Sequence, residues 1–273
     1  MKNLTQKLGH LNWLNSVGIE YYCSTQKESK NSLIATLAQK EHNINENELL
    51  SIKNQTTIDI DMPSAWKKPD PIISDEEKQA RLLADSARSL DELRASIENF
   101  QGCELKSFAS NTVFADGNPR SSIMLIGEAP GATEDIQGIP FCGESGKLLD
   151  NMLKAIGVSR AQNAYITNTV FWRPPANRRP TNEEINICRP FVEKHIALIN
   201  PKLIIIVGNT AAISLLGKNE GITNIRKNIY PYMNQYLDTA INMTAIFHPA
   251  YLLRQPMQKK ATWFDLLKIK EMI

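Results

Sequence analysis

Short apolar stretches alternate with longer amphipathic stretches through the C-terminal part of this chain. The apolar stretches span residues 123–126, 164–169, 203–207 and 242–247, and apolar residues recur at helical spacing over residues 145–156, 181–199 and 209–217. Strands that alternate with helices are typical of a parallel or mixed central sheet with helices on both faces. The sequence therefore predicts an α/β fold for this region.

The chain before this region has a different composition. Residues 1–23 carry apolar side chains at helical spacing and predict an amphipathic helix, whereas residues 24–75 are polar and charged and predict a partly disordered linker. Helices are expected to begin at Ser74 and Ser89, because each serine is followed by acidic residues that suit the first turn of a helix. We therefore expect an N-terminal helix, a linker and one larger domain over residues 76–273.

No apolar run reaches the roughly 20 residues that a membrane-spanning helix needs, and the first residues lack the pattern of a signal peptide. We therefore expect a cytoplasmic protein that makes no membrane contact. Residues 111–273 hold 18 Lys and Arg against 13 Asp and Glu. This excess of positive charge favours a polyanionic partner, although solvated charge is also the ordinary state of a protein surface.

The four cysteines, Cys23, Cys103, Cys142 and Cys188, stand far apart, and no two of them form a C-x-x-C pair. Such spacing predicts neither a disulfide framework nor a self-evident metal site. It fits small apolar residues buried in a core.

A glycine- and proline-broken turn directly follows the first of the predicted strands. It reads Gly127-Glu128-Ala129-Pro130-Gly131, and the chain continues through Glu134 and Asp135 to Gly138-Ile139-Pro140-Phe141-Cys142-Gly143. Ligands of open α/β sheets bind at the carboxyl ends of the strands. We therefore expect this loop to lie beside Asn168 and His248, which end two other predicted strands.

These strand ends combine aromatic, amide and cationic groups. A proline-stiffened loop over residues 171–180 adds further aromatic and arginine side chains. Such a set could hold a planar heterocycle, because an aromatic ring stacks on it, an amide reads its edge and a dipolar group stabilises negative charge. Taken singly, each residue also has an ordinary structural interpretation: Phe141 as core, Asn168 as a satisfied buried amide, and His248 as a loop histidine bonded to backbone.

The order of these motifs over residues 100–270 resembles the family 4 uracil-DNA glycosylases. The resemblance rests on Gly127-Glu128-Ala129-Pro130-Gly131, Glu134-Asp135, Gly138-Ile139-Pro140-Phe141, Asn168, Arg173-Pro174-Pro175-Ala176-Asn177-Arg178 and His248-Pro249-Ala250-Tyr251-Leu252-Leu253-Arg254. It implies a three-layer α/β/α fold and a monomeric enzyme of base-excision repair. The implied reaction is hydrolysis of the bond between uracil and deoxyribose in DNA, without lyase chemistry.

The resemblance also implies roles for individual residues. The catalytic positions would be Glu128, Glu134 and His248, with His248 donating to uracil O2 and either glutamate positioning water or stabilising the sugar cation. The uracil-binding positions would be Gly127, Ala129, Phe141, Asn168 and Asn177, with Phe141 stacking on the base and Asn168 pairing with its O4 and N3 edge. The DNA-binding positions would be Arg173, Arg178, Tyr251, Leu252, Leu253 and Arg254, the last four where such enzymes press a wedge into the duplex and hold phosphates.

The chain departs from the family at two cysteines. Family 4 enzymes hold a [4Fe-4S] cluster on four cysteines, whereas Phe100 and Trp172 stand at two of these positions and only Cys103 and Cys188 remain. Two thiolates cannot supply a ligand for each iron. We therefore expect no cluster, no other metal or cofactor, and apolar packing in its place.

The departure leaves two other functions open. One is a DNA- or abasic-site-binding protein of the same fold with little or no turnover, which the missing cysteines suggest. The other is a subunit whose residues 1–22 recruit repair or replication proteins.

Overall fold

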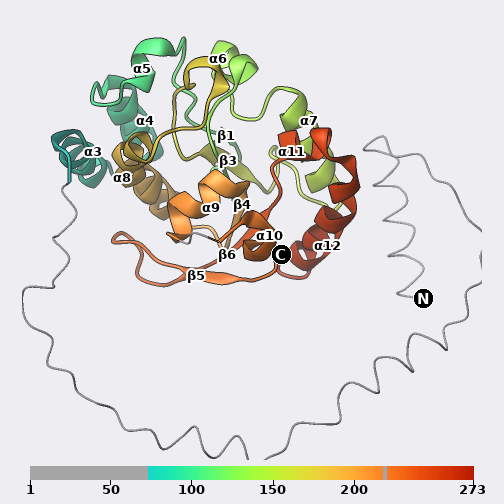
Figure 1. Ribbon diagram of the computed structural model, residues 1–273. Helices are drawn as coiled ribbons and strands as arrows, with labels where there is room; N and C mark the ends of the chain where they lie inside the picture. Colours follow the sequence, from blue (N-terminus) through green and yellow to red (C-terminus); the bar gives the residue numbers. More distant parts are fainter. Residues whose placement is uncertain (1–72, 218–219) are drawn as a thin grey trace, which may run out of the picture. The chain divides into compact units, whose positions relative to one another are not determined.

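The structure is a computed structural model, and it describes residues 73–217 and 220–273 (Figure 1). The predicted N-terminal helix over residues 1–23, and all but the last three residues of the predicted linker, lie outside the described residues. The described chain begins with α3 (Asp75–Ser86) and ends with α12 (Lys259–Lys270).

A six-stranded mixed sheet forms the centre of the described chain, with strand order β1-β3-β2-β4-β6-β5. The inner four strands are parallel, and the short edge strands β1 and β5 pair antiparallel with their neighbours. The strands are β1 (Asp116–Gly117), β2 (Ile123–Gly127), β3 (Tyr165–Asn168), β4 (Leu203–Val207), β5 (Tyr230–Tyr232) and β6 (Ile241–Ile246). Every residue of β2, β3 and β4 is buried, as a parallel sheet covered on both faces requires.

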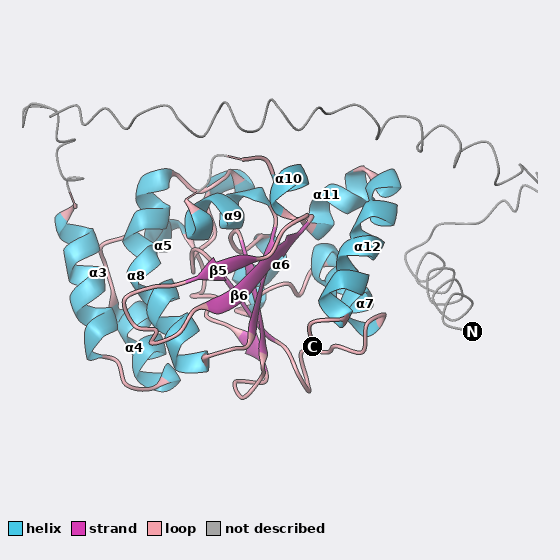
Figure 2. Cartoon of the chain, turned by 90° about the horizontal axis from the view of Figure 1, so that it is seen from below, coloured by secondary structure: helices cyan, strands magenta, loops and turns pink. Residues whose placement is uncertain are grey.

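Helices cover both faces of this sheet (Figure 2). The remaining helices are α4 (Leu90–Asn99), α5 (Leu105–Phe108), α6 (Ala132–Gln137), α7 (Glu144–Lys154), η2 (Pro175–Asn177), α8 (Asn182–Ile199), α9 (Asn209–Leu216), α10 (Ile222–Ile225), α11 (Pro249–Arg254) and η3 (Pro256–Gln258). Side chains of β2 alternate between two cores: Met124 and Ile126 pack with the cluster that α3, α4 and α8 contribute to, whereas Ile123 and Leu125 pack with the cluster of α7 and α12. The predicted three-layer α/β/α fold is thus confirmed.

The structure matches the predicted elements closely inside the domain. The four predicted strands are the four inner strands, and the three predicted helices are α7, α8 and α9, each with ends within two residues. The hydroxyl oxygens of Ser74 and Ser89 accept hydrogen bonds from the backbone N–H groups of Glu77 and Glu92, as the predicted caps require. The sequence patterns did not predict β1 and β5, because strands of two and three residues show no periodicity.

No helix in the described part of the chain is long and apolar enough to cross a membrane.

Candidate active site

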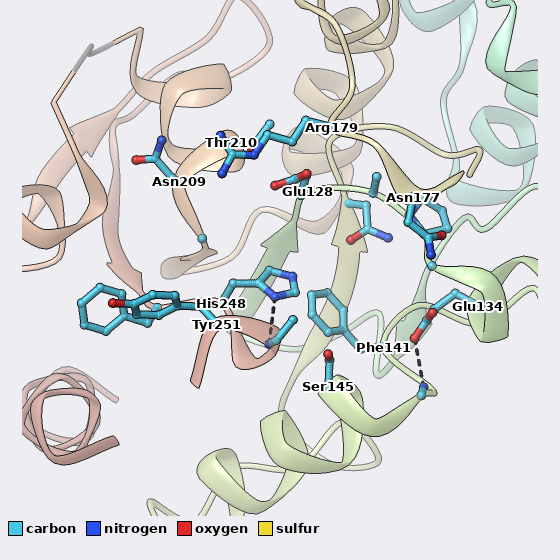
Figure 3. Close-up of a pocket in the computed structure, with 18 of the residues that line it drawn as sticks. Glu128, Glu134, Phe141, Ser145, Asn177, Arg179, Asn209, Thr210, His248 and Tyr251 are labelled. Carbon is cyan, nitrogen blue, oxygen red and sulfur yellow. Dashed lines mark hydrogen bonds between the residues drawn. The ribbon is translucent and has the colours of Figure 1, made fainter. Parts of the chain in front are cut away.

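The carboxyl ends of the parallel strands border a cavity of about 950 Å³. Glu128 follows β2, Asn168 ends β3, Gly208 follows β4 and His248 follows β6, and all four residues line the cavity. Figure 3 shows Phe141, Glu128 and His248 facing this common space from different segments. The predicted meeting of the strand-end residues is therefore present in the structure.

Asn168 and Phe141 meet over Gly127 at the floor of the cavity. A Cβ atom on Gly127 would lie 2.4 Å from Oδ1 of Asn168 and 2.5 Å from Cζ of Phe141, so only glycine lets both side chains approach the strand here. Phe141 is 5% exposed and Asn168 is 1% exposed. Both side chains are therefore fixed by close packing.

The side-chain oxygen of Asn168 is buried and accepts no hydrogen bond from the described residues. An unsatisfied buried acceptor costs about 1–3 kcal/mol. Because Asn168 also lines the cavity, a bound ligand can remove this cost by presenting an N–H group. The site therefore favours a ligand whose edge carries a donor for Oδ1 and an acceptor for the adjacent amide N–H group.

His248 is the N-cap residue of α11, and its Nδ1 accepts a hydrogen bond from the backbone N–H of Ala250 at 3.2 Å. Burial lowers the pKa of His248 to about 4, and the positive charge of Arg254 acts in the same direction. The imidazole is therefore neutral at pH 7. Because Nδ1 is the acceptor, the proton lies on Nε2, which makes the ring a donor for negative charge that forms in the cavity.

The rings of His248 and Phe141 lie next to each other in the lining of the cavity. Their centroids lie 5.7 Å apart and their planes are inclined by 32°. An aromatic face and an N–H donor thus border the same space, beside the amide of Asn168. This combination suits a flat, polar ring better than an apolar or flexible ligand.

The carboxylates of the loop have different surroundings. Glu128 lines the cavity, and among the described residues no group hydrogen-bonds its carboxylate; its backbone oxygen accepts from the Thr169 hydroxyl. Glu134 also lines the cavity, but its Oε1 accepts hydrogen bonds from the backbone N–H groups of Cys142 and Gly143 at 3.1 and 2.9 Å. Of the two predicted catalytic glutamates, Glu128 thus has the carboxylate that is available to a ligand.

The predicted DNA-binding arginines differ in how they are held. Arg178 donates to the carboxylate of Glu184, and this pairing lowers the pKa of Glu184. Arg173 donates to the side chain of Asn177 at 2.8 Å. Arg179, which was not among the predicted site residues, lines the cavity near Glu128 and is exposed (Figure 3). The proline-stiffened loop thus adds positive charge at the cavity mouth.

Helix α11 separates the four predicted wedge and phosphate residues. Leu252 is fully buried in the core, whereas Leu253 is 46% exposed. Tyr251 is partly buried and its ring lies 5.2 Å from that of Phe247. The wedge expectation therefore fails for Leu252, because its side chain points into the core, and Leu253 is the exposed leucine of α11.

Some further residues of the site were not among the predicted site residues. Asn209 and Thr210, at the start of α9, line the cavity beside the predicted residues (Figure 3). Their position directly after the β4 strand was the available signal, since strand-end residues of parallel sheets gather at one edge. Arg160, which is described below, gave no such signal, because it lies in the loop between α7 and β3, 19 residues after the Phe141 whose turn it holds.

The positions of the two missing cysteines lie in the hydrophobic core and not in the lining of the cavity. Phe100 and Trp172 are each 1% exposed, and they belong to the same buried cluster as Cys103 and Cys188. The Phe100 ring packs edge-on against Phe191 at 5.3 Å. Among the described residues, no group of three or more His, Cys, Asp or Glu side chains could hold a metal ion.

Sequence comparisons place this chain in a known class of protein. The sequence profile of the uracil DNA glycosylase superfamily matches residues 114–268, and the chain belongs to this superfamily. That range contains all the strands of the sheet and the residues that line the cavity.

Three of its relatives carry a more particular name. A type-4 uracil-DNA glycosylase of Sulfurisphaera tokodaii is 38% identical over 67% of this chain and 84% of that protein. Proteins of the same name from Archaeoglobus fulgidus and Thermotoga maritima are each 37% identical, over 67% and 58% of this chain and over 93% and 80% of those proteins. The resemblance inferred from the motifs is thus confirmed at the level of the family.

Proposed function

We propose that this protein is a uracil-DNA glycosylase that hydrolyses the bond between uracil and deoxyribose and leaves an abasic site. The observation that carries this proposal is the buried, unpartnered Oδ1 of Asn168, a residue that lines the same cavity as the Phe141 ring and the neutral His248. The names of the three relatives described above, each a type-4 uracil-DNA glycosylase, support the same function.

The donor and acceptor pattern of Asn168 fits uracil. Oδ1 accepts the N3–H group of the base, and the amide N–H donates to O4, so the acceptor without a partner becomes satisfied. Cytosine would oppose this amide with an amino group where a donor already points, and its N3 carries no hydrogen. A site built around such a pair rejects the wrong base strongly, because the mismatched polar groups stay buried and unpaired.

Phe141 contacts the face of the flipped base, and His248 contacts the edge that Asn168 does not bind. The base leaves the helix stack and lies on the Phe141 ring, and the Nε2–H group of His248 donates to O2. As the glycosidic bond breaks, electrons move onto the uracil ring, and a neutral N–H donor stabilises the anion without first losing a proton. A donor of this kind is worth about 10²–10³ in rate.

Glu128 is the carboxylate that we assign to the sugar side of the reaction. Its side chain faces the cavity and is not used by the described residues, so it can orient a water molecule or stabilise the positive charge of the deoxyribose. The backbone of Gly127 and Ala129 is proposed to contact the base. Leu253, Arg254 and the arginines of the proline-stiffened loop are proposed to contact DNA.

We further propose that this chain carries no iron–sulfur cluster. The residues at the family's four cluster positions do not fit a cluster. Cys103 and Cys188 occupy two of these positions, whereas Phe100 and Trp172 occupy the other two and pack in the core. Iron analysis of protein purified without oxygen tests this, and bound iron at a cluster stoichiometry would contradict it.

The enzyme claim is tested with oligonucleotides that carry one uracil, in single and double strands, followed by alkaline cleavage of abasic sites. We expect strand breaks that depend on uracil and are absent with cytosine or thymine at that position. Binding without strand breaks would instead support a DNA-binding protein that has lost turnover.

The remaining proposals concern the setting of the enzyme. We propose that it acts as a monomer in the cytoplasm and that residues 1–23 contact another repair or replication protein. Light scattering of the full chain tests the first point, and comparison of partner capture with and without residues 1–23 tests the second.

A further inference from the structure

Phe141 holds an unusual backbone conformation for an aromatic residue. Its φ angle is +51°, in the left-handed region that large side chains rarely adopt. Such a conformation costs about 1–3 kcal/mol and persists only where the surroundings impose it. The question is therefore which groups hold this turn, since the turn aims the ring that borders the cavity.

Arg160 holds the carbonyl side of the turn. Its Nη2 donates to the carbonyl oxygen of Phe141 at 2.8 Å, and its Nη1 donates to that of Pro140 at 3.0 Å. Asp116 and Asp150 bind the same guanidinium at 2.8 and 3.0 Å, and its side chain is only 19% exposed. The two aspartates thus hold the guanidinium in the position from which it donates to the turn.

Glu134 holds the amide side of the same turn. Its Oε1 accepts the backbone N–H groups of Cys142 and Gly143, the two residues that follow Phe141. Two side chains of opposite charge therefore bind consecutive peptide groups on either side of one strained residue. Hydrogen bonds to charged groups are roughly twice as strong as neutral ones.

Helix α7 closes the turn from a third direction. A Cβ atom on Gly146 would lie 1.7 Å from the carbonyl oxygen of Phe141, so the helix backbone packs directly against this peptide group. On the cavity side, the ring edge contacts Gly127 beside the Asn168 amide. The turn cannot shift without moving the ring relative to Asn168.

We propose that Arg160 and Glu134 form a clamp that sets the position of the Phe141 ring for the base. Both are positioning residues, and Glu134 acts through the backbone rather than on the sugar or water. The inference rests on the proposed function, because it concerns the same pocket. A displacement of about 1 Å at a stacking group can cost roughly 10² in rate, so the clamp is expected to matter for catalysis.

A double-mutant cycle tests the clamp. Single-turnover excision of uracil is measured for the wild type, R160A, F141A and the double variant. We expect R160A to lose about 30–100-fold alone, but less than about threefold in the F141A background, because Arg160 acts through the ring. R160K, which keeps the charge and one donor nitrogen, should recover to within about tenfold of the wild type. Additive losses, or R160A at the wild-type rate, would overturn the proposal.

Glu134 is tested in the same way with E134Q, which keeps one acceptor oxygen of the same shape. We expect a loss of less than about tenfold and no change in the pH profile, because a positioning carboxylate does not exchange protons with the substrate. If E134Q instead lost most of its excision rate and one limb of the pH–rate profile disappeared, Glu134 would take part in the chemical step. The control is R81A, whose arginine pairs with Glu77 on α3 and which should excise uracil within about twofold of the wild type.

Hydrogen exchange of the backbone amides tests the clamp independently of the enzyme's activity. In R160A and E134Q, the backbone N–H groups of residues 138–146 should exchange at least about tenfold faster, while those of β4 keep their protection. Unchanged exchange in this segment would overturn the clamp even if the enzyme is active. Conversely, a wild type that excises no uracil would overturn the proposed function, and the exchange result would still decide the clamp. If R160A does not fold, R160K carries both measurements.

Discussion

The aromatic cluster and the cavity each contain one histidine beside the same sheet, and the two histidines have opposite surroundings. The aromatic cluster consists of Phe100, Phe114, Phe171, Trp172 and Phe191, with Cys103, Cys188 and His195. There His195 is fully buried, stacks on Phe114 at 4.4 Å and bonds the Tyr165 hydroxyl at 2.9 Å. His248, in contrast, borders open space.

Both regions also contain a buried polar atom without a partner among the described residues. In the aromatic cluster it is Nδ1 of His195, and in the cavity it is Oδ1 of Asn168. The first atom is enclosed by packed rings, so no ligand can reach it. The second belongs to Asn168, which lines the cavity. The comparison shows that an unpartnered atom indicates a binding site only where space for a ligand adjoins it.

This contrast predicts that substitutions in the aromatic cluster lower stability, whereas substitutions in the cavity lower the rate. The largest expected effect is that of F100A, because removal of a fully buried ring leaves a cavity and costs about 3–5 kcal/mol of the free energy of unfolding. Denaturant titration measures this. F108A is the matched control, since that ring is 65% exposed and should change stability by less than about 0.5 kcal/mol.

H248A is expected to show the reverse pattern. Loss of the Nε2–H donor should lower the single-turnover rate by about 10²–10³, which corresponds to about 3–4 kcal/mol of transition-state stabilisation. The matched variant H195F should keep the rate within a few-fold, because His195 lies away from the cavity. A rate loss from H195F as large as that from H248A would break the distinction between the two regions.

The pH dependence of stability should come from both histidines. Burial lowers the pKa of His195 to about 3 and that of His248 to about 4, so each stays neutral in the folded protein while the unfolded chain takes up a proton below about pH 6.5. Stability should therefore fall as the pH drops from about 6.5 to 4.5, by roughly 2 kcal/mol for each histidine.

Urea titrations of the wild type and H195F over this range measure the contribution of His195 by difference. The difference removes the opposing effect of Asp265, whose pKa is raised to about 6 by burial. The excision rate should show no histidine titration between pH 5.5 and 8, because His248 is already neutral there. A rate that rises through a pKa near 6.5 would contradict a buried, neutral His248.

The smallest expected effect lies at the rim of the cavity. L253A should leave the free energy of unfolding within about 0.5 kcal/mol and lower the rate on double-stranded more than on single-stranded substrate, by a few-fold, since only a duplex resists base flipping. The control is L82A, which removes an exposed leucine of α3, far from α11 in sequence. It should change neither rate. Equal losses on both substrates would argue against a wedge role for Leu253.

Local sequence patterns predicted the inner strands, the helix caps and the position of the site at the strand ends. The four inner strands follow from buried apolar runs, and the serine caps follow from residue type, because both are local properties. The meeting of Asn168 and His248 with the loop that follows β2 was predictable because parallel strands end at one edge of a sheet. By contrast, the opposite directions of Leu252 and Leu253 depend on how α11 lies on the core, which neighbouring residues do not reveal.

The sequence by itself determined the class of fold, the order of the motifs and the loss of two cluster cysteines, since each is written in residue identity and spacing. The tertiary structure decided how the two glutamates differ, because only the folded loop brings Glu134 to the amides of Cys142 and Gly143. It also brought Arg160 to the Phe141 turn. Contacts of this kind join residues that no local pattern relates, so they exist only once the chain has packed.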